Sequence, residues 1–246
     1  MNALWILGPL VFLAGFIDSI AGGGGLISLP AYLLAGVPIH IAMGTNKVSS
    51  SLGTLVASIN YFIHHQIIKK LALFASVFAL VGAYLGSSLA LMMDGNSLKA
   101  LMLILLPFMA IFLVRQKPQT IDYQSKPIPW VLIGVITFSI GLYDGLIGPG
   151  TGSLLIYGFV SFIHLNYTQA SANAKVVNLA SGIAAIITFG LSNQINLALG
   201  LAAALFSITG NILGSHFALK FGKRIIQPLL LIVFSLMMLK LLLDLI

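Results

Sequence analysis

Long apolar runs occupy almost the entire chain, and they restrict its fold more than any other feature. Only 7% of the 246 residues are charged and 59% are hydrophobic, whereas about a quarter of an ordinary soluble domain is charged. Since one membrane crossing takes about 20 apolar residues, the length allows roughly eight to ten membrane segments. No room is left for a soluble catalytic or nucleic-acid-binding domain, so any function must lie within the bilayer.

The apolar runs predict an all-α, polytopic integral membrane protein. Only helices and closed barrels satisfy their backbone hydrogen bonds in lipid, and the period-two alternation of barrel strands is absent. The expected segments are residues 3–21, 26–39, 41–64, 71–93, 97–114, 128–147, 152–164, 170–191, 196–219 and 225–246. A polar stretch with prolines divides them into a first transmembrane repeat (1–114), a cytoplasmic linker (115–127) and a second transmembrane repeat (128–246).

The two halves resemble each other through three motifs, which recur in the same order at an offset of 126 to 128 residues. The matching pairs are Gly15/Gly141, Asp18/Asp144, Gly22/Gly148, Gly24/Gly150, Lys47/Lys175, Gly82/Gly210 and Gly86/Gly214. Internal duplication is common in transporters, where interrupted segments at matching positions mark the binding site. Here the interruptions are residues 22–25 and 148–152.

Loop charges predict how the halves are oriented. Basic loop residues favour the cytoplasmic side of a membrane, and the net charge of +7 fits such a signal better than a nucleic-acid surface. If each glycine-broken element crosses once, the basic loop residues divide five against four; if it returns to its starting side, they divide eight against one. We therefore predict that each half is a glycine-broken or re-entrant helical hairpin followed by three spans, so that the halves are inverted repeats with both termini outside. The segments 26–39 and 152–164 are also short for a crossing.

The glycine breaks are the expected substrate site. Each glycine costs a helix about 1 kcal/mol relative to alanine, so four in a row should interrupt it. The helix that follows then presents its N-terminus, which favours an anion, to a buried cavity. With the polar residues around the two lysines, the expected substrate-binding residues are Gly23, Gly24, Gly25, Thr45, Asn46, Lys47, Gly150, Thr151, Gly152, Asn173 and Lys175.

Each half also carries one acid and one lysine inside apolar sequence. Such residues are costly in a membrane without partners or water, and they are functional candidates for that reason. One hypothesis is that Asp18 pairs with Lys47 and Asp144 with Lys175 as structural ion pairs. The other gives the lysines an anion-binding role and makes Asp18 and Asp144 proton-coupling groups.

Other chemistries find no support in the sequence. There are no cysteines, the five histidines lack acids at metal-ligand spacing, and no Gly-Lys-Ser/Thr follows the glycine run. No nucleophile and base are spaced as in a hydrolase, so we expect no enzyme, no cofactor, no metal and no nucleic-acid partner. The pairs Gly82/Gly86 and Gly210/Gly214 suit close helix packing, within one protomer or between the two protomers of a homodimer.

The motif set resembles the TauE/SafE family of sulfite exporters and membrane transporters. The resemblance is carried by Gly-x-x-Asp-x-x-x-Gly-Gly-Gly-Gly, Gly-Thr-Asn-Lys, Gly-x-Gly-Pro-Gly-Thr-Gly and Ala-Asn-Ala-Lys, and it covers essentially the whole chain. It implies a multi-pass carrier of the bacterial inner membrane for small anions such as sulfite or organosulfonates.

Three functions follow as hypotheses. The leading one is a secondary anion transporter that alternates access around a midplane site between the repeats, with proton coupling as a further hypothesis. The alternative is a passive anion channel with the same positive, glycine-lined site. In a scaffold protein, by contrast, the glycine and lysine motifs would serve packing alone.

Overall fold

We describe residues 2–101 and 129–221 of a computed structural model, and throughout this part of the chain the regular structure is helical. Residues 95–101 are helical as well. The predicted linker, the segment 225–246 and most of the segment 97–114 lie outside the described residues. The helices are α1 (Asn2–Ala21), α2 (Gly25–Leu34), α3 (Ile39–Ile63), α4 (Lys69–Met92), α6 (Trp130–Leu146), α7 (Thr151–Ile163), α8 (Tyr167–Leu191) and α9 (Leu197–Phe221).

Corresponding helices of the two halves have similar lengths. α3 and α8 each contain 25 residues, and they begin 128 positions apart. α2 and α7 contain 10 and 13 residues, about 15 and 20 Å of helix, too short for a bilayer core of about 30 Å. The predicted segment 26–39 was too long, because the chain takes up a left-handed conformation at Gly36 (φ +79°) before Pro38 and helix α2 has already ended.

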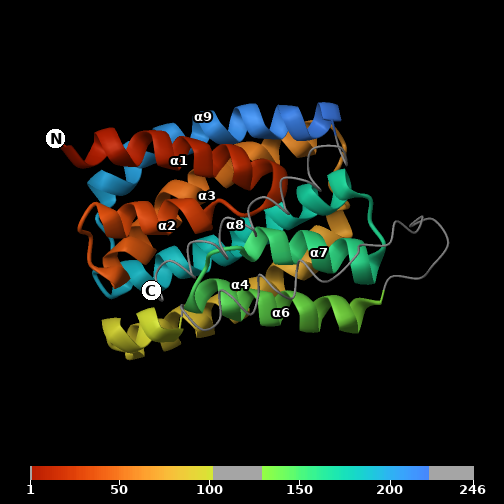
Figure 1. The fold of residues 1–246 in the computed structure, drawn as a ribbon. Coiled ribbons are helices and arrows are strands. Elements are labelled where there is room, and N and C mark those ends of the chain that lie inside the picture. The colour runs from red at the N-terminus through yellow and green to blue at the C-terminus, as the bar shows by residue number, and fades with distance from the viewer. Residues whose placement is uncertain (1, 102–128, 222–246) are drawn as a thin grey trace.

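The glycine runs do interrupt the first helix of each half. Gly22, Gly148 and Gly150 have φ values of +77°, +90° and +87°, a region that residues with a Cβ rarely adopt. Figure 1 shows that the chain turns back there, so that α1 and α2 form one hairpin and α6 and α7 another. The breaks thus place non-helical backbone inside the bundle.

Equivalent helices run in opposite directions. Tyr61, near the end of α3, contacts Ser171, near the start of α8, through hydroxyl oxygens 3.3 Å apart. Near the other ends of the same helices, Gly44 faces Phe189. α3 and α8 are therefore antiparallel, and Figure 1 shows α1 and α6 also pointing in opposite directions.

Glycines allow the halves to interlock. α4 packs on α6, and α1 packs on α9. A Cβ added at Gly82 or Gly86 would overlap the backbone carbonyl of Phe138 or Leu142, and their equivalents Gly210 and Gly214 face the carbonyls of Phe12 and Phe16. The predicted packing role of these four glycines is confirmed, and the contacts they make lie within one chain.

Gly86→Ala should destabilise the protein, although alanine favours a helix. The added methyl group would overlap the Leu142 carbonyl, so α4 and α6 must separate, at a cost of about 1–3 kcal/mol for overpacking. At Gly190, a Cβ would lie 3.7 Å from the Ile195 side chain, an ordinary contact. Thermal unfolding in detergent should show a lower midpoint for Gly86→Ala and an unchanged or higher one for Gly190→Ala. Equal midpoints would contradict the packing.

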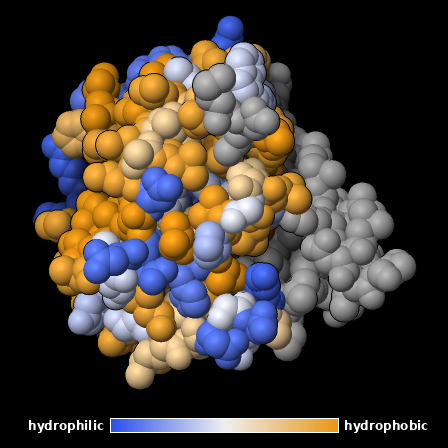
Figure 2. Space-filling view, turned by 90° about the vertical axis from the view of Figure 1, so that its left-hand side faces the viewer, coloured by the Kyte–Doolittle hydropathy of each residue, from blue (hydrophilic) through white to orange (hydrophobic). Residues whose placement is uncertain are grey.

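The outside of the bundle suits a membrane. Four of the described helices, α1, α4, α8 and α9, are long and apolar enough to cross one, and their sides expose large apolar residues such as Leu73 and Leu205. Figure 2, which views one end of the bundle, shows polar residues among apolar ones. Asp94 follows the end of α4 and is exposed. Hydrogen bonds from the backbone N–H and the hydroxyl of Ser97 lower the pKa of its carboxyl group.

Candidate functional site

Four charged side chains meet at the centre of the bundle and form two ion pairs. The Lys47 ammonium lies 2.7 Å from a carboxylate oxygen of Asp144, and the Lys175 ammonium lies 2.6 Å from one of Asp18. Each pair therefore joins the two halves. The predicted pairs Asp18/Lys47 and Asp144/Lys175 were wrong in their partners, because the interlocked halves bring the lysine of one repeat to the acid of the other.

Asp144 is surrounded by donors. Besides Lys47, the Thr151 hydroxyl donates to it at 2.6 Å and the Ser181 hydroxyl at 2.7 Å. Thr151 begins α7, so this carboxylate occupies the positive end of a helix dipole. The protein's own carboxylate thus lies where the sequence led us to expect a bound substrate anion.

Asp18 lies in the equivalent place and has fewer donors. The Gly24 backbone N–H, at the start of α2, donates to it at 3.2 Å, in addition to the contact from Lys175. The residues equivalent to Thr151 and Ser181 are Gly25 and Gly53, which have no side chain to donate. One side of the Asp18 carboxylate is thus left open to other groups.

The two glycine breaks touch each other. The Ser153 backbone N–H donates to the Gly22 carbonyl at 3.0 Å, and the Ser153 hydroxyl donates to the Ala21 carbonyl at 2.8 Å. A Cβ at Gly152 would lie 2.6 Å from the Gly22 Cα, so the backbones approach as closely as glycine permits. These contacts satisfy part of the non-helical backbone, as a membrane interior requires.

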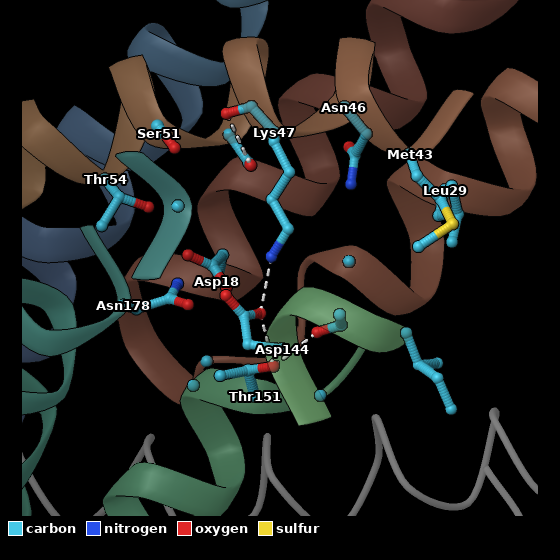
Figure 3. A pocket seen from close by; sticks show the side chains of 18 residues that line it. Asp18, Leu29, Met43, Asn46, Lys47, Ser51, Thr54, Asp144, Thr151 and Asn178 are labelled. Carbon is cyan, nitrogen blue, oxygen red and sulfur yellow. Dashed lines mark hydrogen bonds and ion pairs between the residues drawn. The ribbon is translucent and has the colours of Figure 1, made fainter. Parts of the chain in front are cut away.

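A cavity of about 40 Å³ lies between the breaks and α3. A single buried water needs only about 10–15 Å³, so the space matches a few waters or one compact anion. Figure 3 shows Lys47 reaching from α3 to Asp144 beside Thr151. The predicted site residues that line this cavity are Asp18, Gly25, Asn46, Lys47, Asp144, Gly150, Thr151 and Gly152.

The other predicted site residues lie outside this lining. Lys175 is fully buried in its ion pair. Thr45 accepts a hydrogen bond from the backbone N–H of Asn196, and its equivalent Asn173 accepts one from that of Ile68, at 2.9 and 3.1 Å. Thr45 thus anchors the start of α9 and Asn173 the start of α4, and neither residue lines the cavity. Gly23 is absent from the lining, and Gly24 lines a second cavity.

Several lining residues were not in the predicted set. Ser50, Ser51 and Thr54 follow Lys47 along α3, and Asn178 follows Lys175 along α8. Their spacing of three or four residues from each other or from a lysine was the available signal, since such positions share a helix face. Ser181, which donates to Asp144, gave no signal because its equivalent in the first half is Gly53.

Apolar helices around a buried, charged cavity are typical of a membrane protein with a polar site enclosed in its helical bundle. The sequence matches the family model described as Sulfite exporter TauE/SafE over residues 7–241. The chain belongs to the TauE/SafE family of membrane transporters, which confirms the resemblance seen in its motifs.

Relatives along the whole chain carry similar descriptions. A probable membrane transporter protein, ORF9, of Sinorhizobium is 36% identical, over 95% of this chain and 90% of that protein. One from Haemophilus influenzae is 34% identical, over 99% and 96%. YfcA of Escherichia coli, another probable membrane transporter protein, is 33% identical, over 99% and 94%. No solved structure matches the chain significantly.

Proposed function

We propose that the protein is a secondary transporter of small sulfur oxyanions, such as sulfite or sulfonates, in the bacterial inner membrane. The observation that carries the proposal is the Lys47–Asp144 pair, which lies in the wall of a small cavity between the halves. Lys47 is the single basic side chain among the described residues that line this cavity. An oxyanion would compete with Asp144 for contact with this positive charge.

The charge balance favours coupling to a cation. Lys47, Lys175, Asp18 and Asp144 sum to zero, so an entering anion would leave the buried site with a net negative charge, which is costly in a low-dielectric interior. Protonation of Asp144 would release Lys47 to the anion and, for a singly charged anion, restore neutrality. Proton and oxyanion would then enter the site together.

The cavity also offers neutral contacts for oxyanion oxygens. The hydroxyls of Ser51 and Thr54 and the amides of Asn46 and Asn178 belong to its wall. A volume of about 40 Å³ favours a compact anion such as sulfite over a sulfonate with a longer organic part. Size and hydrogen bonding together would select the substrate.

Inverted repeats would give this site access to both sides of the membrane. The antiparallel α3 and α8 and the opposed hairpins support such a relation, and the loop charges favour a cytoplasmic linker. Since the cavity lies where the halves meet, a rocking motion between them would expose Lys47 to each side in turn. The proposed site lies near the membrane midplane.

The test is uptake of radiolabelled sulfite and sulfoacetate into proteoliposomes, with and without an imposed pH gradient. We expect saturable sulfite uptake that a pH gradient stimulates several-fold, with weaker uptake of sulfoacetate. Sulfite flux that does not change with the pH gradient and is accompanied by unitary currents would identify a passive anion channel instead. Absence of flux for both anions would reject the substrate class.

A further inference from the structure

A second cavity of about 20 Å³ adjoins the open side of Asp18. Residues from α1, α2, α3 and α9 line it, among them Asn46 and Ser49 of α3 and Ser207 and Asn211 of α9. Asp18 and Asn46 also line the larger cavity that contains Lys47. A ligand in the second cavity would therefore share one carboxylate and one amide with the proposed anion site.

Two buried amide oxygens in this wall lack a donor. The Asn46 and Asn211 Oδ1 atoms have no hydrogen-bond partner within the described part of the chain, although these residues are only 8% and 1% exposed. The Asn211 side-chain nitrogen donates to the Ser207 carbonyl at 2.9 Å, which fixes the orientation of that amide. Buried polar atoms without partners are rare and indicate a missing water or ion.

Two of the hydroxyl hydrogens nearby are already used. The Ser28 hydroxyl donates to the Gly24 carbonyl at 3.2 Å, and the Ser49 hydroxyl donates to the Asn46 carbonyl at 3.1 Å. Their oxygens can still accept, although that of Ser49 already accepts from the Tyr32 hydroxyl at 2.9 Å. With the carboxylate of Asp18 and the two amide oxygens, the wall is rich in hard oxygen ligands.

Four polar residues of this wall have apolar equivalents around Asp144. The positions that match Asn46, Ser49, Ser207 and Asn211 are Ala174, Val177, Ala79 and Ala83. In the first half, a Cβ at Gly15 would lie 2.8 Å from the Asn211 side-chain nitrogen, so the missing side chain makes room for that amide. The polar lining of the second cavity is thus a departure from the internal repeat.

We propose that this second cavity binds a monovalent cation, namely sodium. Oxygen ligands with a single carboxylate suit a small hard cation of low charge, whereas calcium sites gather several carboxylates. The described residues contain no cluster of three His, Asp or Glu side chains that would hold a divalent ion. The volume also limits the occupant to a single ion with little or no water.

The coupling role of this ion rests on the proposed transport function. A doubly charged oxyanion in the larger cavity brings two negative charges to a neutral set of side chains. One proton on Asp144 and one sodium ion beside Asp18 would offset both. Because Asp18 belongs to both cavities, occupancy by the cation would raise affinity for the anion, and the reverse.

Binding of ²²Na⁺ to the purified full chain, without any anion substrate, tests the site directly. We expect saturable binding of one ion per chain and a higher thermal unfolding midpoint in NaCl than in KCl or choline chloride at equal ionic strength. Asn211→Ala, which installs the residue found at the matching position of the other half, should weaken binding about tenfold or more, because one ligand to a charged group is lost.

Two further variants separate a lost ligand from a damaged fold. Asn211→Asp retains an oxygen ligand and should keep ²²Na⁺ binding. Thr209→Ala alters an exposed residue of the same helix, whose hydroxyl donates to the carbonyls of Leu205 and Phe206 one turn earlier, and this variant should bind as the unmodified chain does. Absence of saturable ²²Na⁺ binding, or equal binding by Asn211→Ala, would overturn the sodium site and leave water as the occupant.

The same preparation separates this proposal from the transport function. Sulfite uptake in choline buffer without ²²Na⁺ binding would reject the sodium site and keep the transporter. Saturable ²²Na⁺ binding without uptake of sulfite or sulfoacetate would keep the site and reject the transported substrate. If both hold, replacing external sodium with choline should lower sulfite uptake severalfold.

Discussion

Lys47→Met should abolish sulfite uptake while the protein remains folded. The lysine is the single basic group in the described wall of the larger cavity, and methionine preserves most of its length and apolar stem. Loss of a charge-assisted contact of about 3 kcal/mol corresponds to a drop of roughly 100-fold in uptake. Uptake into proteoliposomes, normalised to correctly folded protein, measures the effect.

The fold should survive this change because Asp144 retains other partners. Thr151 and Ser181 still donate to its carboxylate, and the adjoining cavity can admit water. The matched control is Lys47→Met combined with Asp144→Asn, which removes the residual charge and should be equally inactive and at least as stable. Uptake at the unmodified rate by Lys47→Met would exclude this lysine from the substrate site.

Lys175→Met, unlike Lys47→Met, should cause a large loss of stability. Lys175 is fully buried and lies against Asp18, so its removal leaves a carboxylate without its charge partner. Breaking such a buried pair typically costs about 3–5 kcal/mol. The midpoint of thermal unfolding in detergent should fall strongly, and a second change, Asp18→Asn, should recover much of the loss.

A double-mutant cycle distinguishes pairing between halves from pairing within one half. Asp18→Asn combined with Lys175→Met should show a coupling free energy, because the two groups touch. Asp18→Asn combined with Lys47→Met joins residues of the same half that form no ion pair, and its effects should be closer to additive. Stronger coupling in the second combination would contradict the arrangement of the charges.

Much of the fold could be predicted from the chain alone. Apolar length, the glycine runs and the internal repeat indicated the helices, their breaks and the close glycine contacts. The end of α2 was placed too late, because the apolar run continues to Ile39, although Gly36 and Pro38 are residues that commonly follow a helix end. Which helices lie side by side is a tertiary fact, to which the segment pattern gave no guide.

The candidate site was predicted in its residue types more than in its partners. All four charged residues were identified because such groups are costly in a membrane. The sequence could not show that the halves interlock, so each lysine was paired with the acid of its own half. Thr45 and Asn173 were assigned to the substrate because they adjoin the lysines, whereas they hold neighbouring helices. Asn211 was overlooked, although comparison of the repeats shows an amide where the first half has Ala83.

Because each ion pair joins the two halves, neither pair can form until the second half has been synthesised. When the first half enters the membrane, Asp18 and Lys47 are already present, but the partner of each still lies in unsynthesised chain. The two ion pairs are equivalent to each other: the acid of each half contacts the lysine of the other, as in the self-complementary interface of a two-fold dimer. The two halves of the single polypeptide thus behave like the two subunits of a dimer. Neither half neutralises its own buried charges, and both ion pairs form only when the halves pack together.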